Sequence, residues 1–453
     1  MNILTAALVF LALTTIVGAA AARDSADPKF YDWARTPPMG WNSWDCYGTS
    51  VTEEQTLANA DYMAENLKSH GWQYITVDIQ WYEPNARRHT YRKDARLEMD
   101  DFGRLLPAAN RFPSTDRTRS FKPFADAIHA RGLKFGLHLL RGIPRQAVQE
   151  NTQILNTPYH AADIADTTDV CLWNPDMYGV DMTKPGAQEY YDSVFQLLAS
   201  WEIDLVKVDD LSRPYHTAEI EAIRKAIDKT NRPIVFSTSP GATPLADGSH
   251  IATHANMWRI SDDFWDDWKL LKEQFERLDA WTPHRGPGHF PDADMLPLGN
   301  VRAFESHGWT HLTHDEQITF MTLWCISRSP LIMGGNLPNN DPFTLSLLTN
   351  DAILAVDQNS SGNHQLFRDG DFVCWVADVP DSKDKYVALF NAKDHPVRSD
   401  SKTESISVKL KDLGFDLATV RDLWTGESQG KLTGSFSADI PYHGAGLFRF
   451  SPI

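Results

Sequence analysis

The chain has 453 residues, of which 42% are hydrophobic and 23% are charged. Such a chain can bury a large core, so disorder is excluded, and its length favours one large domain with a smaller one. The formal net charge of −17 opposes binding to nucleic acid, because phosphates attract Lys and Arg patches. The 15 tryptophans could stack on sugars, although Trp is also ordinary core material.

Residues 1–22 have the pattern of an export signal. Residues 3–17 are almost wholly apolar, and the small residues 18–22 precede the first charge, Arg23. The apolar run is shorter than the roughly 20 residues that a membrane span needs, and no later stretch is long and apolar enough. We therefore expect a cleaved signal peptide and a secreted or periplasmic protein without a membrane span.

The four cysteines have no CxxC spacing and no His at zinc-ligand intervals, so we expect no metal site, and nothing implies a cofactor. Cys325 and Cys374 lie in apolar runs and are expected to be buried thiols. Cys46 and Cys171 lie in loop-like contexts. Their pairing stays open, because a disulfide depends on a Cα separation that the sequence does not show.

From residue 36 to about 338, short apolar runs alternate with amphipathic helical stretches, which is typical of repeated βα units. The eight expected strands cover residues 39–43, 74–78, 134–138, 205–209, 234–238, 257–260, 295–298 and 330–333. Eight strands favour a (β/α)8 TIM barrel over a doubly wound sheet, in a catalytic domain spanning 23–358. One expected helix has its periodic run at 190–201, with Thr183 as its cap.

After residue 359 the sequence changes to short alternating runs that are separated by Gly, Asp, Ser and Pro turns. Examples of the expected strands are residues 371–377, 385–391, 405–410 and 446–451. We interpret residues 359–453 as an antiparallel β-sandwich. No low-complexity linker precedes it, so the two domains are expected to pack closely.

Carboxylates gather at the expected carboxyl ends of the barrel strands, where reactive groups of such barrels lie. They are Asp78, Asp209, Asp262, Asp263, Asp292 and Asp294. A single strand-end Asp would ordinarily cap a helix or accept from loop amides. Several around one mouth repel one another, which favours a functional reason. Two suffice for glycoside hydrolysis, in which one attacks the anomeric carbon and the other donates and then accepts a proton.

Two further residues on the expected strands, Lys207 and His138, are candidates for the site. Lys207 alternates with Asp209, so both side chains face the same side of the strand, and the cation can keep the carboxylate ionised. His138 ends the third strand. It could reach a sugar hydroxyl or serve as a structural hydrogen-bonding residue, and both interpretations stay open.

From residue 36 onward the chain resembles glycoside hydrolase family 27, the α-galactosidase family. The motifs that carry the resemblance are residues 36–44, 77–78, 207–209, Trp258-Arg259 with Asp263 and Trp268, residues 291–296 and residues 329–332. The resemblance implies a retaining mechanism on an oligo- or polysaccharide, with Asp209 as nucleophile and Asp263 as acid/base. The residues expected around the bound sugar are Trp41, Asp78, Ile79, His138, Lys207, Ser239, Arg259 and Asp294.

The choice between Asp262 and Asp263 depends on spacing. In the family, the acid/base stands four residues after an Arg and five before a Trp, and Asp263 meets both counts from Arg259 and Trp268. Asp262 stays as the alternative, since neighbours on an extended segment face opposite ways.

Three departures from the family pattern concern specificity. Ile79 stands where family α-galactosidases usually carry an acid near the C6 hydroxyl, and the family's β-L-arabinopyranosidases recognise a pentose that lacks C6. The small residues around Ser239 are similar to those of α-N-acetylgalactosaminidases. Leu211 replaces a Cys that usually follows the nucleophile.

The resemblance therefore predicts a retaining exo-glycosidase that releases terminal α-D-galactosyl or β-L-arabinopyranosyl residues from plant-type glycans, with Ile79 favouring the pentose. The alternatives are an α-N-acetylgalactosaminidase and a carbohydrate-binding barrel without activity. The presence of both Asp209 and Asp263 favours an enzyme. The sequence does not indicate the oligomeric state.

Overall fold

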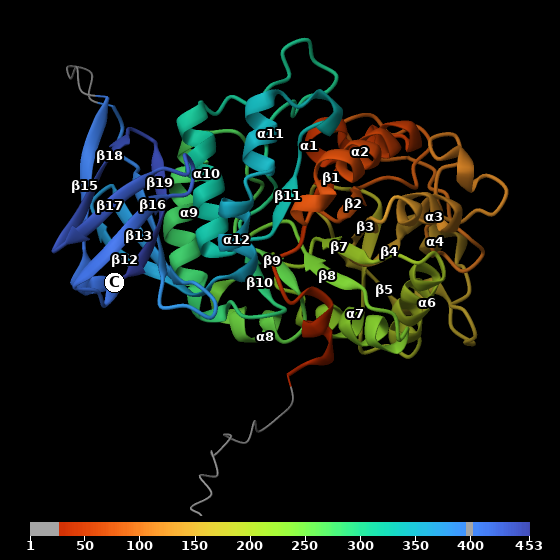
Figure 1. The fold of residues 1–453 in the computed structure, drawn as a ribbon. Coiled ribbons are helices and arrows are strands. Elements are labelled where there is room, and N and C mark those ends of the chain that lie inside the picture. The colour runs from red at the N-terminus through yellow and green to blue at the C-terminus, as the bar shows by residue number, and fades with distance from the viewer. Residues whose placement is uncertain (1–26, 396–401) are drawn as a thin grey trace, which may run out of the picture.

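The computed structural model describes residues 27–395 and 402–453. The expected signal peptide, residues 1–22, lies outside them, so the export signal stays a prediction. In the described part no helix is long and apolar enough to cross a membrane. A helix-covered barrel precedes a β-sandwich, which is drawn in blue at one side of the molecule in Figure 1.

Eight parallel strands form the barrel, in the spatial order β10-β9-β8-β7-β3-β2-β1-β11. Their bounds are β1 Met39–Asn42, β2 Tyr74–Val77, β3 Lys134–Leu140, β7 Leu205–Asp209, β8 Val235–Thr238, β9 Met257–Arg259, β10 Phe290–Asp292 and β11 Leu331–Met333. A parallel bridge between Leu296 and Met333 joins the segment after β10 to β11. The predicted (β/α)8 barrel is thus confirmed.

The expected seventh strand, residues 295–298, is wrong. The strand is β10, and the apolar run that follows it contributes only the single bridge of Leu296. Pro291 argues against a strand because it has no N–H to donate. The structure accommodates it because β10 pairs with β9 on one side only, and the N–H that faces β9 belongs to Phe290, which donates to the Asn256 carbonyl at 2.9 Å.

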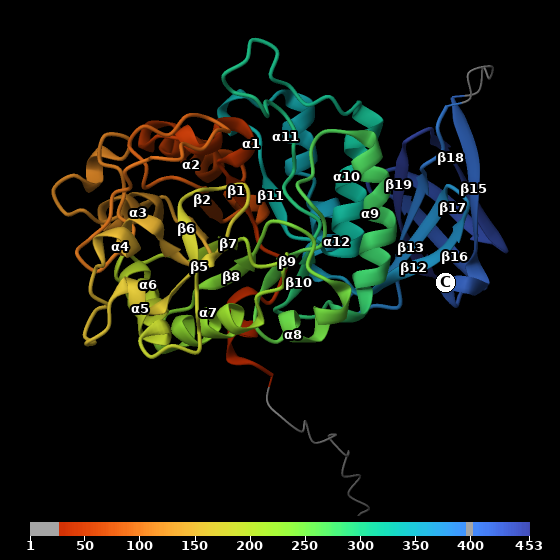
Figure 2. The same cartoon turned by 180° about the vertical axis from the view of Figure 1, so that it is seen from behind.

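Helices cover the outside of the barrel, as Figures 1 and 2 show from opposite sides. They are α1 Trp44–Tyr47, α2 Glu53–Asn66, α3 Lys122–Ala130, α4 Arg145–Glu150, α5 Ala161–Ile164, α6 Ala187–Ser200, α7 Thr217–Lys229, α8 Gly248–Ala252, α9 Trp268–Trp281, α10 His314–Ser327, α11 Pro342–Leu348 and α12 Asp351–Asn359. Thr183 does not cap α6, because that helix starts after Gly186, which has a φ of 96°. The Thr183 hydroxyl instead donates to Asp181 at 2.6 Å.

A small antiparallel sheet that the sequence analysis missed follows β3. It has the order β4-β6-β5, with β4 Ile143–Pro144, β5 Ala165–Val170 and β6 Met177–Val180. Its strands are short, and β5 reads Ala-Asp-Thr-Thr-Asp-Val without a clear apolar alternation. The loop between β5 and β6 becomes important at the active site.

The C-terminal domain is an antiparallel β-sandwich, as predicted. One sheet has the order β12-β13-β14-β19-β16-β17, and the other pairs β15 with β18. The bounds are β12 Ser361–Asp369, β13 Phe372–Asp378, β14 Lys385–Asn391, β15 Thr403–Lys409, β16 Leu417–Asp422, β17 Ser428–Thr433, β18 Ser435–Pro441 and β19 Ala445–Pro452. The large sheet packs on α9 and α10, where the rings of Phe275 and Phe390 lie 5.0 Å apart.

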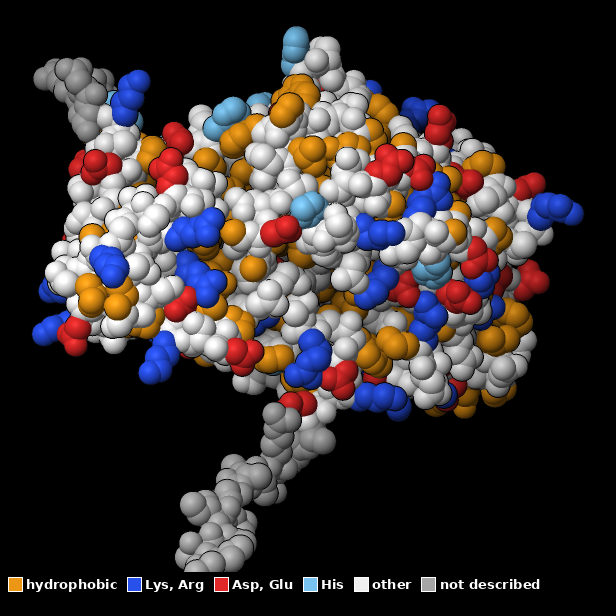
Figure 3. All heavy atoms as spheres, viewed as in Figure 1, with side chains coloured by type: hydrophobic (Ala, Val, Ile, Leu, Met, Phe, Trp, Pro, Cys, Tyr) orange, Lys and Arg blue, Asp and Glu red, His pale blue; other side chains and the backbone are white. Residues whose placement is uncertain are grey.

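Two general features bear on the sequence predictions. All four cysteines lie in the described part as buried free thiols, so Cys46 and Cys171 are not paired there. On the face shown in Figure 3, acidic and basic side chains are interspersed over both domains rather than gathered by sign.

Candidate active site

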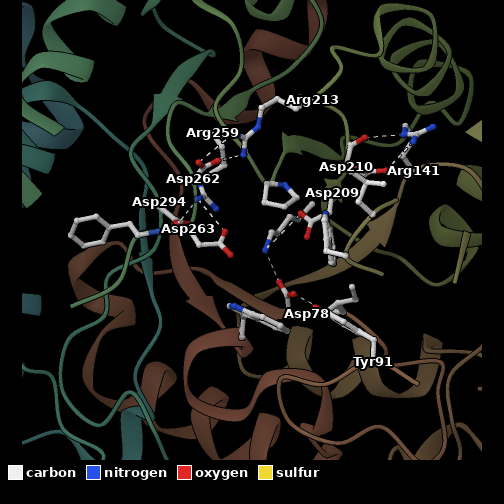
Figure 4. Close-up of a pocket in the computed structure, with 18 of the residues that line it drawn as sticks. Asp78, Tyr91, Arg141, Asp209, Asp210, Arg213, Arg259, Asp262, Asp263 and Asp294 are labelled. Atoms are coloured by element: carbon white, nitrogen blue, oxygen red, sulfur yellow. Dashed lines mark hydrogen bonds and ion pairs between the residues drawn. The ribbon is translucent and has the colours of Figure 1, made fainter. Parts of the chain in front are cut away.

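A cavity of about 750 Å³ is lined by residues from the carboxyl ends of the barrel strands and the loops that follow them. Seven of the residues predicted from the sequence line it, namely Asp78, Ile79, Lys207, Asp209, Arg259, Asp263 and Asp294. Six of these seven residues are charged, and Figure 4 shows how several of them converge. The fold thus brings together residues that are up to 216 positions apart, from Asp78 to Asp294.

Asp209 is the last residue of β7, and its two carboxylate oxygens have different surroundings. Oδ2 lies 2.8 Å from Nε2 of His138, and Oδ1 lies 3.9 Å from Nζ of Lys207. Among the described residues, Oδ1 has no hydrogen-bond partner. His138 and Lys207 thus flank the carboxylate of Asp209, a group that can act as a nucleophile.

Lys207 on β7 and Asp78, which follows β2, form a buried ion pair across the intervening strand β3. Nζ of Lys207 donates to Oδ2 of Asp78 at 2.9 Å, and the Asn42 side-chain amide donates to the same oxygen at 2.7 Å. The backbone N–H of Ile79 donates to Oδ1 at 2.8 Å. Burial alone would raise the pKa of Asp78, but Lys207, His138 and the N–H of Ile79 hold that pKa below its usual range.

Arg259 joins the acids on the opposite side of the cavity. Its Nη2 lies 2.7 Å from Oδ2 of Asp294 and donates to Oδ1 of Asp263 at 3.3 Å. The side chain of Asp263 is 53% exposed, so a solvent molecule or substrate can reach it. Asp262 pairs instead with Arg213 at the rim. The contact with the buried Arg259 thus distinguishes Asp263 from its neighbour.

Asp294 has an unusual backbone and an unusual charge balance. Its φ of 90° is rare for a residue other than Gly, and such conformations are found at functional sites. Burial raises the pKa of Asp294 to about 7, although Arg259 opposes the shift. The N–H of Phe264 donates to Oδ2 at 2.7 Å.

Three residues that were predicted to contact the sugar, Trp41, His138 and Ser239, do not line this cavity, so their contact with a sugar stays a prediction. Trp41 is fully buried, and its Nε1 donates to the Gly335 carbonyl at 2.9 Å. His138 is also fully buried and faces Asp209. Ser239 accepts from Nη1 of Arg259 at 3.3 Å. His138 and Ser239 thus lie beside charged groups of the site, and Ser239 lines a small adjoining pocket of about 30 Å³.

Trp44, the first residue of α1, lines the cavity in place of Trp41. Both tryptophans lie in the same sequence motif. Trp41 lies within β1, where its neighbours enclose it, whereas Trp44 comes after the strand has ended. The rule that barrel strands present reactive groups beyond their carboxyl ends could have identified Trp44.

Other cavity residues carried no signal in the sequence. Asp45 is buried in the first turn of α1, and burial raises its pKa well above the usual range. Arg141, from the loop after β3, binds Asp169 at 2.7 Å, Asp210 at 2.9 Å and Glu219 at 3.0 Å. Asp210 directly follows the nucleophile candidate Asp209, so Arg141 holds the chain beside that residue.

Comparison with known proteins places this geometry in a family. Residues 172–359 match the protein-family model described as Alpha galactosidase A, and residues 369–450 match that of the Alpha galactosidase C-terminal beta sandwich domain. The crystal structure of a β-L-arabinopyranosidase of glycoside hydrolase family 27 from Geobacillus stearothermophilus is 52% identical, with a TM-score of 0.90. The similarity covers 94% of this chain and 99% of that one. The chain belongs to glycoside hydrolase family 27.

Other relatives in the family carry different names. A proposed α-N-acetylgalactosaminidase from Bacillus halodurans is 48% identical, with a TM-score of 0.81, over 92% of this chain and 97% of that one. An α-galactosidase from Cyamopsis tetragonoloba is 26% identical over 449 residues, which are 95% of this chain and 92% of its own. The predicted glycoside hydrolase is thus confirmed at the level of the family, whose named activities differ in the sugar that they release.

Proposed function

We propose that this glycosidase is a retaining exo-enzyme that releases terminal β-L-arabinopyranosyl residues, and α-D-galactosyl residues more slowly. Ile79 is the observation that carries the choice of sugar. Its side chain is buried to 1% exposure, lines the cavity and directly follows the ion-paired Asp78. The 52% identical relative that is named a β-L-arabinopyranosidase supports the same choice.

The reaction proceeds in two displacements. A carboxylate oxygen of Asp209 attacks the anomeric carbon while Asp263 donates its proton to the departing glycosidic oxygen, which gives a glycosyl ester of Asp209. Asp263 then takes a proton from water as that water attacks the anomeric carbon and releases Asp209. Two inversions at one carbon retain its configuration. Lys207 assists the first step, because its positive charge favours the ionised form of a nearby carboxylate.

Ile79 favours the pentose because its side chain cannot accept or donate a hydrogen bond. In galactose a hydroxymethyl group projects from C5, and its hydroxyl needs a hydrogen-bond partner when it is buried. An Ile side chain offers none, whereas it can pack against a ring that ends at C5. An apolar contact discriminates only by roughly 10- to 200-fold, so galactosides should still react.

The second candidate is an α-N-acetylgalactosaminidase. The small Ser239 and the 48% identical relative from Bacillus halodurans favour it. Against it, Ser239 is buried and accepts a hydrogen bond from Arg259, and it does not line the main cavity. Ser239 lines only a small adjoining pocket of about 30 Å³, which is about the share of one water molecule in the liquid and too little for a 2-acetamido group.

The test is a comparison of kcat/KM for three p-nitrophenyl glycosides on the same preparation. They are the β-L-arabinopyranoside, the α-D-galactopyranoside and the α-N-acetylgalactosaminide. We expect the pentoside to be fastest, the galactoside to follow within roughly 200-fold and the acetamido sugar to be slowest. A fastest rate on the acetamido sugar would instead establish the second candidate.

A further inference from the structure

The outer part of the active-site cavity is lined by apolar side chains that no described residue covers. Leu172 is 94% exposed and Trp173 is 39% exposed, and both line the cavity. They form the tip of the loop between β5 and β6. Tyr91 and Trp265 line the cavity as well. Large apolar side chains that are exposed beside a functional cavity indicate a binding surface.

Tyr91 and Trp173 are already paired. Their ring centroids lie 5.6 Å apart with an interplanar angle of 54°. Figure 4 shows Tyr91 beside Asp78. Burial, together with the charges of Asp209, Asp78 and Asp263, raises the pKa of Tyr91, so its ring lies within the field of the reacting carboxylates and stays neutral. The pair therefore connects the charged inner part of the cavity to its apolar outer part.

The loop that carries Trp173 rests on a buried polar base. Asn174 is 1% exposed, and its side-chain oxygen accepts from the N–H of Asp176 at 2.8 Å. The Asp176 carboxylate in turn accepts from Gln80 at 3.0 Å and from the Tyr82 hydroxyl at 2.9 Å. These bonds tie the loop to the segment that follows Asp78. The exposed tip is thus held in place on one side of the cavity.

The cavity is also larger than one sugar requires. A pentose has ten non-hydrogen atoms, and at no more than about 30 Å³ each, the share of a water molecule in the liquid, it occupies at most about 300 Å³. The cavity of about 750 Å³ leaves more than half of its volume for the group on the other side of the scissile bond. The leaving oxygen departs beside Asp263, which is next but one to Trp265 in the sequence.

We propose that Tyr91, Leu172, Trp173 and Trp265 form a subsite for the leaving group, and that its occupant is a pyranose ring of a carbohydrate chain. This inference rests on the proposed function, because it places the leaving group next to Asp263. The apolar face of the ring stacks on Trp173. Polar side chains that also line the cavity, Thr168, Asp169, Arg213 and Asp262, serve its hydroxyl groups. An aromatic surface with a polar rim suits a sugar, which has an apolar face and a polar edge.

The test compares two substrates that share the glycone and differ in the leaving group. β-L-Arabinopyranosyl fluoride has a leaving group of one atom, whereas a disaccharide with a terminal β-L-arabinopyranosyl residue on a second pyranose fills the subsite. Trp173→Ala should lower kcat/KM for the disaccharide about tenfold, the upper range for one aromatic contact, and change that for the fluoride less than about twofold. Trp309→Ala is the matched control, because Trp309 is also 39% exposed and does not line the cavity.

Each other outcome overturns a defined part of this account. Equal losses on both substrates, or no loss on the disaccharide, would show that Trp173 does not bind the leaving group. A wild type that fails to hydrolyse the fluoride would instead remove the proposed function, independently of the subsite. Sedimentation of the wild type and of Leu172→Ala tests the remaining occupant: a smaller assembly in the variant would mean that a second copy of the chain covers this surface.

Discussion

Asp209 ends β7 inside the cavity, with His138 and Lys207 beside its carboxylate. We expect Asp209→Ala to remove nearly all turnover, because no other carboxylate can then form the glycosyl ester. Added azide should restore part of the activity and yield a glycosyl azide of inverted configuration, since a small anion can enter the vacated space. The product is identified by proton NMR. Undiminished turnover in the variant would assign the nucleophile to another residue.

The contact of Asp263 with Arg259 and that of Asp262 with Arg213 give the two neighbours different expected roles. Asp263→Ala should slow substrates with poor leaving groups by about 100-fold or more and activated aryl glycosides much less, because only the former need a proton delivered to the departing oxygen. Asp262→Ala is the matched control and should affect both classes mildly. If the strong dependence on the leaving group follows Asp262 instead, the acid/base assignment is wrong.

Asp45 provides a prediction about pH and stability. Its pKa is raised by burial, so between about pH 4 and that raised value the folded protein holds a proton that the unfolded chain has released. Stability must therefore fall as pH rises through this window, by about 1.4 kcal/mol per pH unit for one proton. Asp45→Asn does not titrate and has nearly the same shape.

We thus expect the stability of Asp45→Asn relative to wild type to increase from pH 5 to pH 7 in urea unfolding experiments. The close packing of the Asp45 carboxylate against Gly334 makes a variant of the same size necessary, since larger side chains would not fit. A constant difference between variant and wild type at the two pH values would mean that Asp45 is ionised in the folded protein.

At the scale of elements, the sequence predicts best where local pattern and tertiary context agree. The ends of β2 and β7 were recognisable from Asp78 and Asp209, whereas β3 continues past His138, its predicted end, to Leu140. The seventh strand failed because β10 contains a proline and an acid, while a more apolar segment follows it. The small sheet of β4, β5 and β6 was missed because β4 has only two residues and β5 lacks a repeating apolar pattern.

In the active site, too, some residues could be predicted from the sequence and others could not. The predicted acids and cations were found because strand ends concentrate them at one mouth, and seven predicted residues line the cavity. Tyr91 and Trp173 were missed because they lie on loops, where no periodicity fixes the direction of a side chain, and Trp44 was missed although it follows the end of β1. Arg141 was missed because its partners Asp169 and Glu219 come from distant parts of the chain.

Helix α10 links these elements to the second domain, and its start is well defined. Thr313 accepts from the N–H of Glu316, whose carboxylate accepts from the N–H of Thr313 at 2.8 Å. Thr313→Ala should lower the free energy of unfolding by about 1 kcal/mol, as measured by urea unfolding, because it removes one half of this capping box. Thr313→Ser keeps the hydroxyl and should retain most of the stability. Equal losses in both variants would show that the methyl group, rather than the cap, matters.

At the scale of the molecule, the two domains have different roles. All residues that line the main cavity belong to the barrel, and the sandwich packs against α9 and α10. His443 of the sandwich binds Glu316 of α10 at 2.7 Å and stacks on Trp268 of α9. The sandwich therefore supports the barrel from outside the site. Since family members with this fold carry names for different sugars, specificity must depend on individual cavity residues.

The claim that Ile79 selects the sugar is tested most directly by one ratio. It is kcat/KM for p-nitrophenyl β-L-arabinopyranoside divided by kcat/KM for the α-D-galactopyranoside, measured in wild type and in Ile79→Asp. The new carboxylate supplies an acceptor for the C6 hydroxyl and is left desolvated and unpaired when the pentose binds. We predict a wild-type ratio above one that falls about tenfold or more in the variant. An unchanged ratio, or a shift toward the pentose, would show that Ile79 does not recognise the C5 substituent and would contradict the assignment of the sugar.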